Sequence, residues 1–108
     1  MNKTIYKENH TAMLALLDNG QIYIQGIGQS MTPKLNSGEI CIVERVTEET
    51  ELEKNDIVFC KARGHYYLHL ISAIKGGTYQ ISNNHGHSNG FISRKNIYGK
   101  VIGKAQAK

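Results

Sequence analysis

Short apolar runs separated by glycine-containing turns are the feature that most restricts how this chain can fold. The 108 residues include 11 glycines and one proline, and the runs between turns are too short for long helices. Ile22 and Ile24 alternate with polar neighbours, as in a half-buried strand, whereas the run at 40–46 is apolar enough for burial on both faces. We expect one domain over residues 9–103 and a tail at 104–108. Its predicted fold is mainly β, a coiled or barrel-like sheet, with strands at residues 21–27, 40–46, 56–61, 65–74, 78–82, 91–92 and 97–102.

The N-terminal region predicts one short helix that covers one side of the sheet. Residues 1–8 are polar and are expected to be flexible. Asn9 or Thr11 can cap a helix over residues 10–18, and Gly20 is a natural left-handed stop. The apolar residues of this segment share one helical face: Met13, Leu14, Leu16 and Leu17.

Composition and charge argue against several classes of function. The formal net charge is +4, but the lysines are scattered, whereas nucleic-acid binding needs clustered positive charge. No run approaches the ~18 apolar residues of a membrane span, and no motif calls for a cofactor. Cys41 and Cys60 lie in apolar strand-like runs with no secretory leader before them, so we expect two reduced, buried thiols in a cytoplasmic protein.

Two polar side chains in the strand framework suggest chemistry. Ser30 lies in the turn Gly28-Gln29-Ser30-Met31-Thr32-Pro33, between the first two strands, and His69 lies inside a hydrophobic strand. Taken singly, a serine in a turn is a turn former and a histidine in a strand is a satisfied core residue. Together, a hydroxyl and an imidazole are the minimum requirement for nucleophilic catalysis.

The order of several weak motifs gives this pair more weight. Over residues 20–103 the chain resembles the LexA/signal-peptidase superfamily of serine peptidases, whose members share a coiled β domain. The resemblance rests on the order and spacing of these segments: Gly28-x-Ser30-Met31-x-Pro33, Leu35-x-x-Gly38-Glu39, Asn55-Asp56-Ile57-Val58, Leu68-His69, Tyr79 to Asn84, and Tyr98-Gly99-Lys100-Val101.

The resemblance implies roles for individual residues. Ser30 stands at the position of the nucleophile, and His69 at that of the general base. A histidine there is typical of the branch that includes endoplasmic-reticulum and archaeal signal peptidases. Asn83 stands where that branch has an aspartate, and an amide cannot supply the negative charge that stabilises an imidazolium. Asp56 is another candidate for orienting the ring, and so are two nearby imidazoles, His85 and His87.

The substrate site is also implied by the resemblance. The oxyanion would be bound by backbone N–H groups of Gly28, Gln29 and Ser30, with Met31 and Tyr67 as pocket walls. Family substrates are peptides with small residues before the cleaved bond, held as an extended strand against a sheet edge. Family members also carry a DNA-binding domain or a membrane anchor, for which this sequence has no segment, so we expect a stand-alone, soluble protein.

Two alternatives to a serine peptidase stay open. The first is a peptide-binding module of the same fold that is weakly active or inactive, which the amide at position 83 favours. The second is a metal site, because His65 and His69 share a strand face and a neighbouring loop adds His85 and His87.

Overall fold

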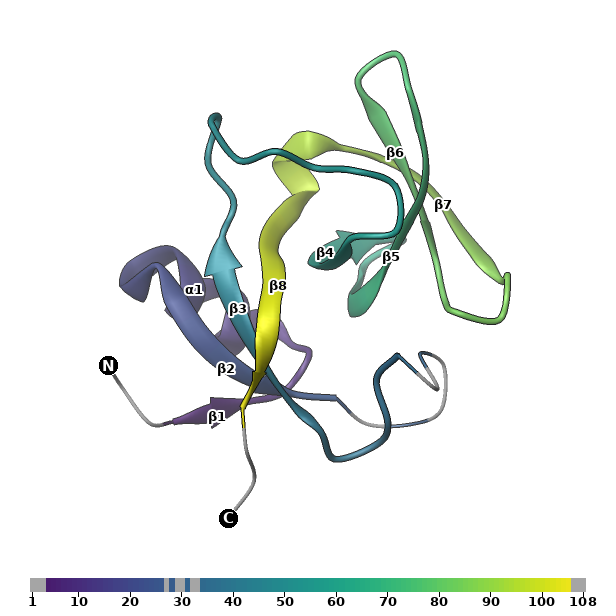
Figure 1. The fold of residues 1–108 in the computed structure, drawn as a ribbon. Coiled ribbons are helices and arrows are strands. Elements are labelled where there is room, and N and C mark those ends of the chain that lie inside the picture. Colours follow the sequence, from purple (N-terminus) through teal and green to yellow (C-terminus); the bar gives the residue numbers. More distant parts are fainter. Residues whose placement is uncertain (1–3, 27, 29–30, 32–33, 106–108) are drawn as a thin grey trace.

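The computed structural model of the protein describes residues 4–26, 28, 31 and 34–105. This part of the chain is mainly β, with eight strands and one α-helix (Figure 1). The elements, in chain order, are β1 (Ile5–Tyr6), α1 (His10–Asn19), β2 (Gln21–Gln25), β3 (Ile40–Arg45), β4 (Ile57–Ala62), β5 (His65–Lys75), β6 (Thr78–Ser82), β7 (Ser88–Ser93), a 3-10 helix (Arg94–Asn96) and β8 (Ile97–Ala105). The predicted mainly β fold with one short N-terminal helix is confirmed.

The described strands form one sheet in the order β1-β2-β3-β8-β4-β5-β6-β7. β1 runs parallel to β2, and every other neighbouring pair is antiparallel. β8 joins the two halves, because it pairs with β3 on one side and with β4 on the other. The register shifts at Ile42/Val43 and at Phe59/Cys60, and such bulges bend a sheet. Figure 1 shows β8 between the part that contains α1 to β3 and the part that contains β4 to β7.

The first apolar core lies between α1 and the sheet. Asn9 caps the helix by accepting the Ala12 N–H, and Gly20 ends it with a φ of 81°. Ala12 and Leu16 are fully buried. They pack in one cluster with residues of β2 to β5 and of the segment after β2: Ile22, Ile24, Met31, Leu35, Cys41, Val43, Phe59, Leu68 and Leu70.

The second core lies among β4 to β8. Val58 and Cys60 of β4 belong to it, whereas Phe59 between them belongs to the first core. The β4 strand is therefore buried on both faces. Ile71 of β5 lies in the same cluster, together with Ala62, Tyr79, Ile81, Ile92 and Ile97.

Three sequence expectations differ from the structure. Residues 5–6 lie in the segment expected to be flexible, but they form β1 beside β2. The run at 40–46 was expected to be buried on both faces, and this is wrong: Glu44 and Arg45 of β3 are exposed. The tail expected at 104–108 begins later, because β8 continues to Ala105.

Two further expectations concern the thiols and the membrane. Cys41 and Cys60 are free and buried, as predicted. Within the described residues, no helix is long and apolar enough to cross a membrane.

Candidate active site

The predicted nucleophile and one neighbour lie outside the described residues: Ser30 and Gln29. The pairing of Ser30 with His69 therefore stays a prediction. Gly28 next to them has a φ of 95°, which favours glycine and suits a sharp turn. Its N–H donates to Ser37 Oγ at 3.1 Å, so this predicted oxyanion donor is engaged within the turn.

The predicted base is buried in the sheet. His69 lies on β5 opposite Val58 of β4, and its exposed fraction is 5%. Its Nδ1 lies 2.7 Å from the backbone oxygen of Leu68. Because a carbonyl oxygen only accepts hydrogen bonds, Nδ1 carries the hydrogen. The Nε2 atom of the neutral ring therefore has the lone pair, which is the state a general base requires.

The surroundings of His69 favour its neutral form. Burial lowers the pKa of this imidazole, the hydrogen bond to the Leu68 carbonyl raises it in part, and the nearby His87 lowers it further. The ring of Tyr67 stacks on that of His69, with centroids 4.5 Å apart and an interplanar angle of 25°. At neutral pH the imidazole is thus uncharged and held between an aromatic face and a backbone carbonyl.

The two residues predicted as pocket walls lie in different places. Met31 has an exposed fraction of 4% and belongs to the first core, whereas Tyr67 packs against the second. Met31 instead lines a cavity of about 10 Å³ together with Leu68, the residue before the predicted base. Met31 therefore lies close to β5, one residue away from His69.

Among the described residues, the first part of β5 has a strand neighbour on one side only, so its other edge is open. Residues 65–69 pair with β4, and pairing with β6 begins only at Leu70, opposite Ser82. Ile71 directs its N–H and C=O towards β4, where they bond Asp56 and Asn55. Because these groups alternate sides along a strand, the N–H and C=O of Leu68 point towards the open edge.

Both backbone groups of Leu68 are engaged by side chains. The Leu68 C=O accepts from His69 Nδ1, and the Leu68 N–H donates to Glu8 Oε1 at 2.7 Å. Sequence reasoning missed Glu8, which lies 60 residues before Leu68. No motif in the chain marks a contact between a side chain and a backbone group so far apart in sequence.

Asn83 organises the loop between β6 and β7. Its Oδ1 accepts from the N–H groups of His85 and His87, each at 2.9 Å, and its own N–H donates to the His87 carbonyl. The loop places His87 within electrostatic range of His69. The group on Nδ1 of His69 is the Leu68 carbonyl, which no side-chain motif could indicate.

The other candidates for orienting His69 or binding a metal have different surroundings. The Asp56 carboxylate accepts from the Glu53 N–H at 2.8 Å and lies 3.4 Å from Lys100 Nζ, so it stabilises the loop before β4. Among the described side chains, no group of three or more His, Cys, Asp or Glu residues is placed to hold a metal ion.

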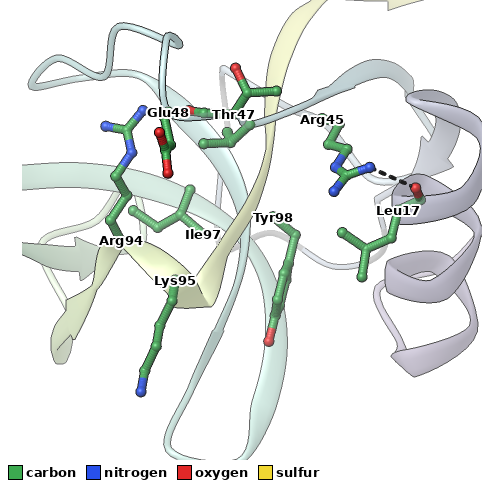
Figure 2. A pocket seen from close by; sticks show the side chains of 9 residues that line it. Leu17, Arg45, Thr47, Glu48, Arg94, Lys95, Ile97 and Tyr98 are labelled. Carbon is green, nitrogen blue, oxygen red and sulfur yellow. Dashed lines mark hydrogen bonds between the residues drawn. The ribbon is translucent and has the colours of Figure 1, made fainter.

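A groove of about 460 Å³ lies at a different place, beside the end of α1 (Figure 2). Its arginines are committed to structural bonds. Arg45 donates to the Leu17 carbonyl at 2.9 Å, and Arg94 donates to the Thr47 and Thr50 carbonyls. The Arg45 bond ties β3 to α1, and the Arg94 bonds tie the acidic loop after β3 (residues 47–55) to the 3-10 helix. Tyr67 and His69 do not line this groove.

The mainly β domain and its buried, neutral imidazole agree with the peptidase-like fold that the resemblance predicts. The sequence matches the family described as Peptidase S24-like over residues 3–104. The chain belongs to this family, and the predicted membership of the LexA/signal-peptidase superfamily is confirmed. No curated protein matches the sequence significantly.

Proposed function

We propose that the protein is a serine endopeptidase-like hydrolase that cleaves a peptide bond through an acyl-enzyme on Ser30, with His69 as general base. One observation carries the proposal. His69 Nδ1 donates to the Leu68 carbonyl, so Nε2 is left as the acceptor for a serine proton. Family membership supports the fold on which this chemistry depends.

The steps follow from the roles of these two side chains. Nε2 of His69 takes the hydroxyl proton as Ser30 Oγ attacks the carbonyl carbon of the peptide bond. The carbon–nitrogen bond then breaks, and the imidazolium gives the proton to the leaving amine. Water deprotonated by the same Nε2 then attacks the ester, and the imidazolium returns this proton to Ser30 Oγ as the ester bond breaks. Backbone N–H groups of Gln29 and Ser30 are the proposed donors to the oxyanion, since that of Gly28 is engaged by Ser37.

The proposed base, His69, differs from the histidine of a Ser-His-Asp triad in the group that binds its Nδ1. A carboxylate on Nδ1 stabilises the imidazolium, whereas the Leu68 carbonyl offers only a dipole. Replacing the carboxylate by an amide in a well-studied triad costs about 10⁴ in rate, although that change also disturbs the tautomer. Here the tautomer is fixed, so we expect a slow enzyme of the histidine-base type rather than an inert one.

The proposed substrate is a peptide or an unfolded protein segment. An extended chain can pair with the open edge of β5 at Leu68, which adds a strand to the sheet and brings its backbone next to His69. We propose that the protein acts in the cytoplasm without a cofactor and does not bind nucleic acid. The two free, buried thiols of Cys41 and Cys60 suit a reducing compartment.

A fluorophosphonate probe, which reacts with activated serines, tests the hydrolase proposal. We expect labelling of the native protein and none of Ser30→Ala. Ser93→Ala is the matched control, since the Ser93 side chain makes no capping bond at the 3-10 helix. Labelling that persists in Ser30→Ala would remove Ser30 from the mechanism.

The second candidate is a peptide-binding module that does not cleave. The neutral partner of Nδ1 favours it, because no carboxylate supports the charged imidazolium. An absence of labelling at every pH, together with binding of an unfolded protein, would decide for the module.

A further inference from the structure

We propose that Glu8 is a built-in competitor for the peptide-binding edge of β5, holding the Leu68 N–H that a bound peptide backbone would otherwise use. The inference rests on the proposed substrate mode but not on catalysis. It concerns which group occupies the edge before a peptide arrives.

The contact occupies a hydrogen-bonding position that strand pairing requires. The Leu68 N–H points to the side of β5 on which residues 65–69 have no strand neighbour among the described residues. An added strand would place a backbone carbonyl oxygen against this N–H. Glu8 Oε1 already lies there, 2.7 Å from the Leu68 nitrogen. A carboxylate oxygen is a stronger acceptor than a peptide oxygen, so it competes effectively.

Glu8 is held in place from both sides along the chain. β1 ends two residues before it and is paired with β2. Asn9, the next residue, caps α1 through the Ala12 N–H and donates its own N–H to the Lys7 carbonyl. The carboxylate is therefore presented by two anchored elements.

A second contact joins the same segment to a side chain of β5. His10 Nδ1 lies 2.8 Å from the Tyr66 hydroxyl, and Tyr66 is two residues before Leu68. Glu8 also lines the small cavity that Leu68 shares with Gly28 and Met31. Glu8 thus lies at the edge of β5 on the side where Gly28 and Met31 also lie.

The consequence is a competition that lowers peptide affinity. A peptide must break the bond between Glu8 and Leu68 before its own carbonyl can bind the Leu68 N–H. Removing the carboxylate should tighten peptide binding by about 10-fold, which corresponds to about 1.4 kcal/mol. Glu8→Gln keeps an acceptor oxygen without charge, and its effect should be smaller.

The experiment measures binding with cleavage switched off. Fluorescein-labelled casein, an unfolded protein, is titrated by fluorescence anisotropy against proteins that carry Ser30→Ala. The variants Glu8→Ala and Glu8→Gln are added to this background. Glu49→Ala is the matched control, because Glu49 is an exposed residue of the acidic loop and its loss changes the net charge equally. Exchange of the Leu68 amide hydrogen reports the contact itself.

We expect Glu8→Ala to bind casein most tightly, Glu8→Gln less tightly and Glu49→Ala least tightly. The Leu68 amide hydrogen should exchange faster in Glu8→Ala. Casein binding by Glu8→Ala that is no tighter than by the Glu49→Ala control would overturn the proposal. So would faster exchange of Leu68 without any gain in affinity, since the contact would then be only structural. If Glu8→Ala does not fold, the comparison of Glu8→Gln with the control decides in the same way. Tighter binding by a protein that never reacts at Ser30 would support the competition and contradict the hydrolase proposal.

Discussion

Replacing Gly99 by alanine should destabilise the whole domain, because this position has no room for a methyl group. Gly99 lies on β8 where α1 crosses the sheet. A Cβ there would lie 2.4 Å from Val43 Cγ1, 2.7 Å from Leu16 Cδ2 and 3.2 Å from the backbone oxygen of Glu44. Both side chains are fully buried in the first core, so they cannot turn into solvent. The helix must move away from the sheet or the strand must bend.

The magnitude follows from the cost of overpacking. One extra methyl in a filled core costs about 1–3 kcal/mol. For a domain of this size each kcal/mol lowers the thermal midpoint by about 4–8 °C, so we expect a drop of roughly 5–20 °C. Urea denaturation followed by circular dichroism measures the free energy of unfolding directly.

Gly103→Ala is the matched control on the same strand. A Cβ at Gly103 meets only Ile42 Cδ1, at 3.8 Å, which is an ordinary contact. Both substitutions restrict the unfolded chain equally, so the difference between them isolates the overpacking. In a Val43→Ala background, Gly99→Ala should cost less stability than it does in the native protein, because the closest atom is removed. Two results would refute the described packing of α1 on β8. One is equal free energies of unfolding for Gly99→Ala and Gly103→Ala, and the other is no coupling free energy between positions 43 and 99.

Three further predictions concern titrating and loop-forming groups. Because burial lowers the pKa of His69 and the base must be neutral, the rate of serine labelling should rise with pH along a limb centred below about 6.5; a limb above that value would contradict the burial. Asn83→Ala removes the acceptor of two backbone N–H groups, so the amide hydrogens of His85 and His87 should exchange faster; unchanged exchange would show that Asn83 does not organise the loop. Burial raises the pKa of the Cys41 thiol to about 11 and that of Cys60 to about 12, so a thiol reagent should react only after unfolding; prompt reaction of the native protein would contradict the burial.

The sequence predicts the parts of the fold that local patterns encode. The helix α1 was expected over 10–18 and spans His10–Asn19, because a cap and a left-handed glycine mark its ends. β1 could not be found, since Ile5–Tyr6 is too short for any periodicity to appear. The two-sided burial was assigned to the run at 40–46, but it occurs in β4. Which strand lies between the two cores depends on the order of strands in the sheet. That order, with β8 near its centre, is set by contacts between residues far apart in sequence, so local patterns do not reveal it.

Side-chain identity is the part of the candidate site that the sequence can address. His69 was selected from its place in an apolar strand and from the resemblance, and the structure buries it beside Tyr67. The sequence offers Asn83, His85, His87 and Asp56 as side-chain partners for Nδ1. A backbone carbonyl fills that place, and every residue has one, so composition cannot single it out. The contact of Glu8 with Leu68 cannot be predicted from sequence either, because Glu8 binds a backbone N–H, which almost every residue has.

The proposed role of His69 in activating Ser30 is tested most directly by the rate at which a fluorophosphonate modifies Ser30, located by mass spectrometry of the digested protein. His65→Gln is the matched control for His69→Gln, because His65 lies on the same strand and is exposed. General bases contribute at least about 100-fold, so His69→Gln should slow modification of Ser30 by about that factor or more, with His65→Gln unchanged. Equal rates in the native protein and in a folded His69→Gln variant would contradict the assignment of this imidazole as the base.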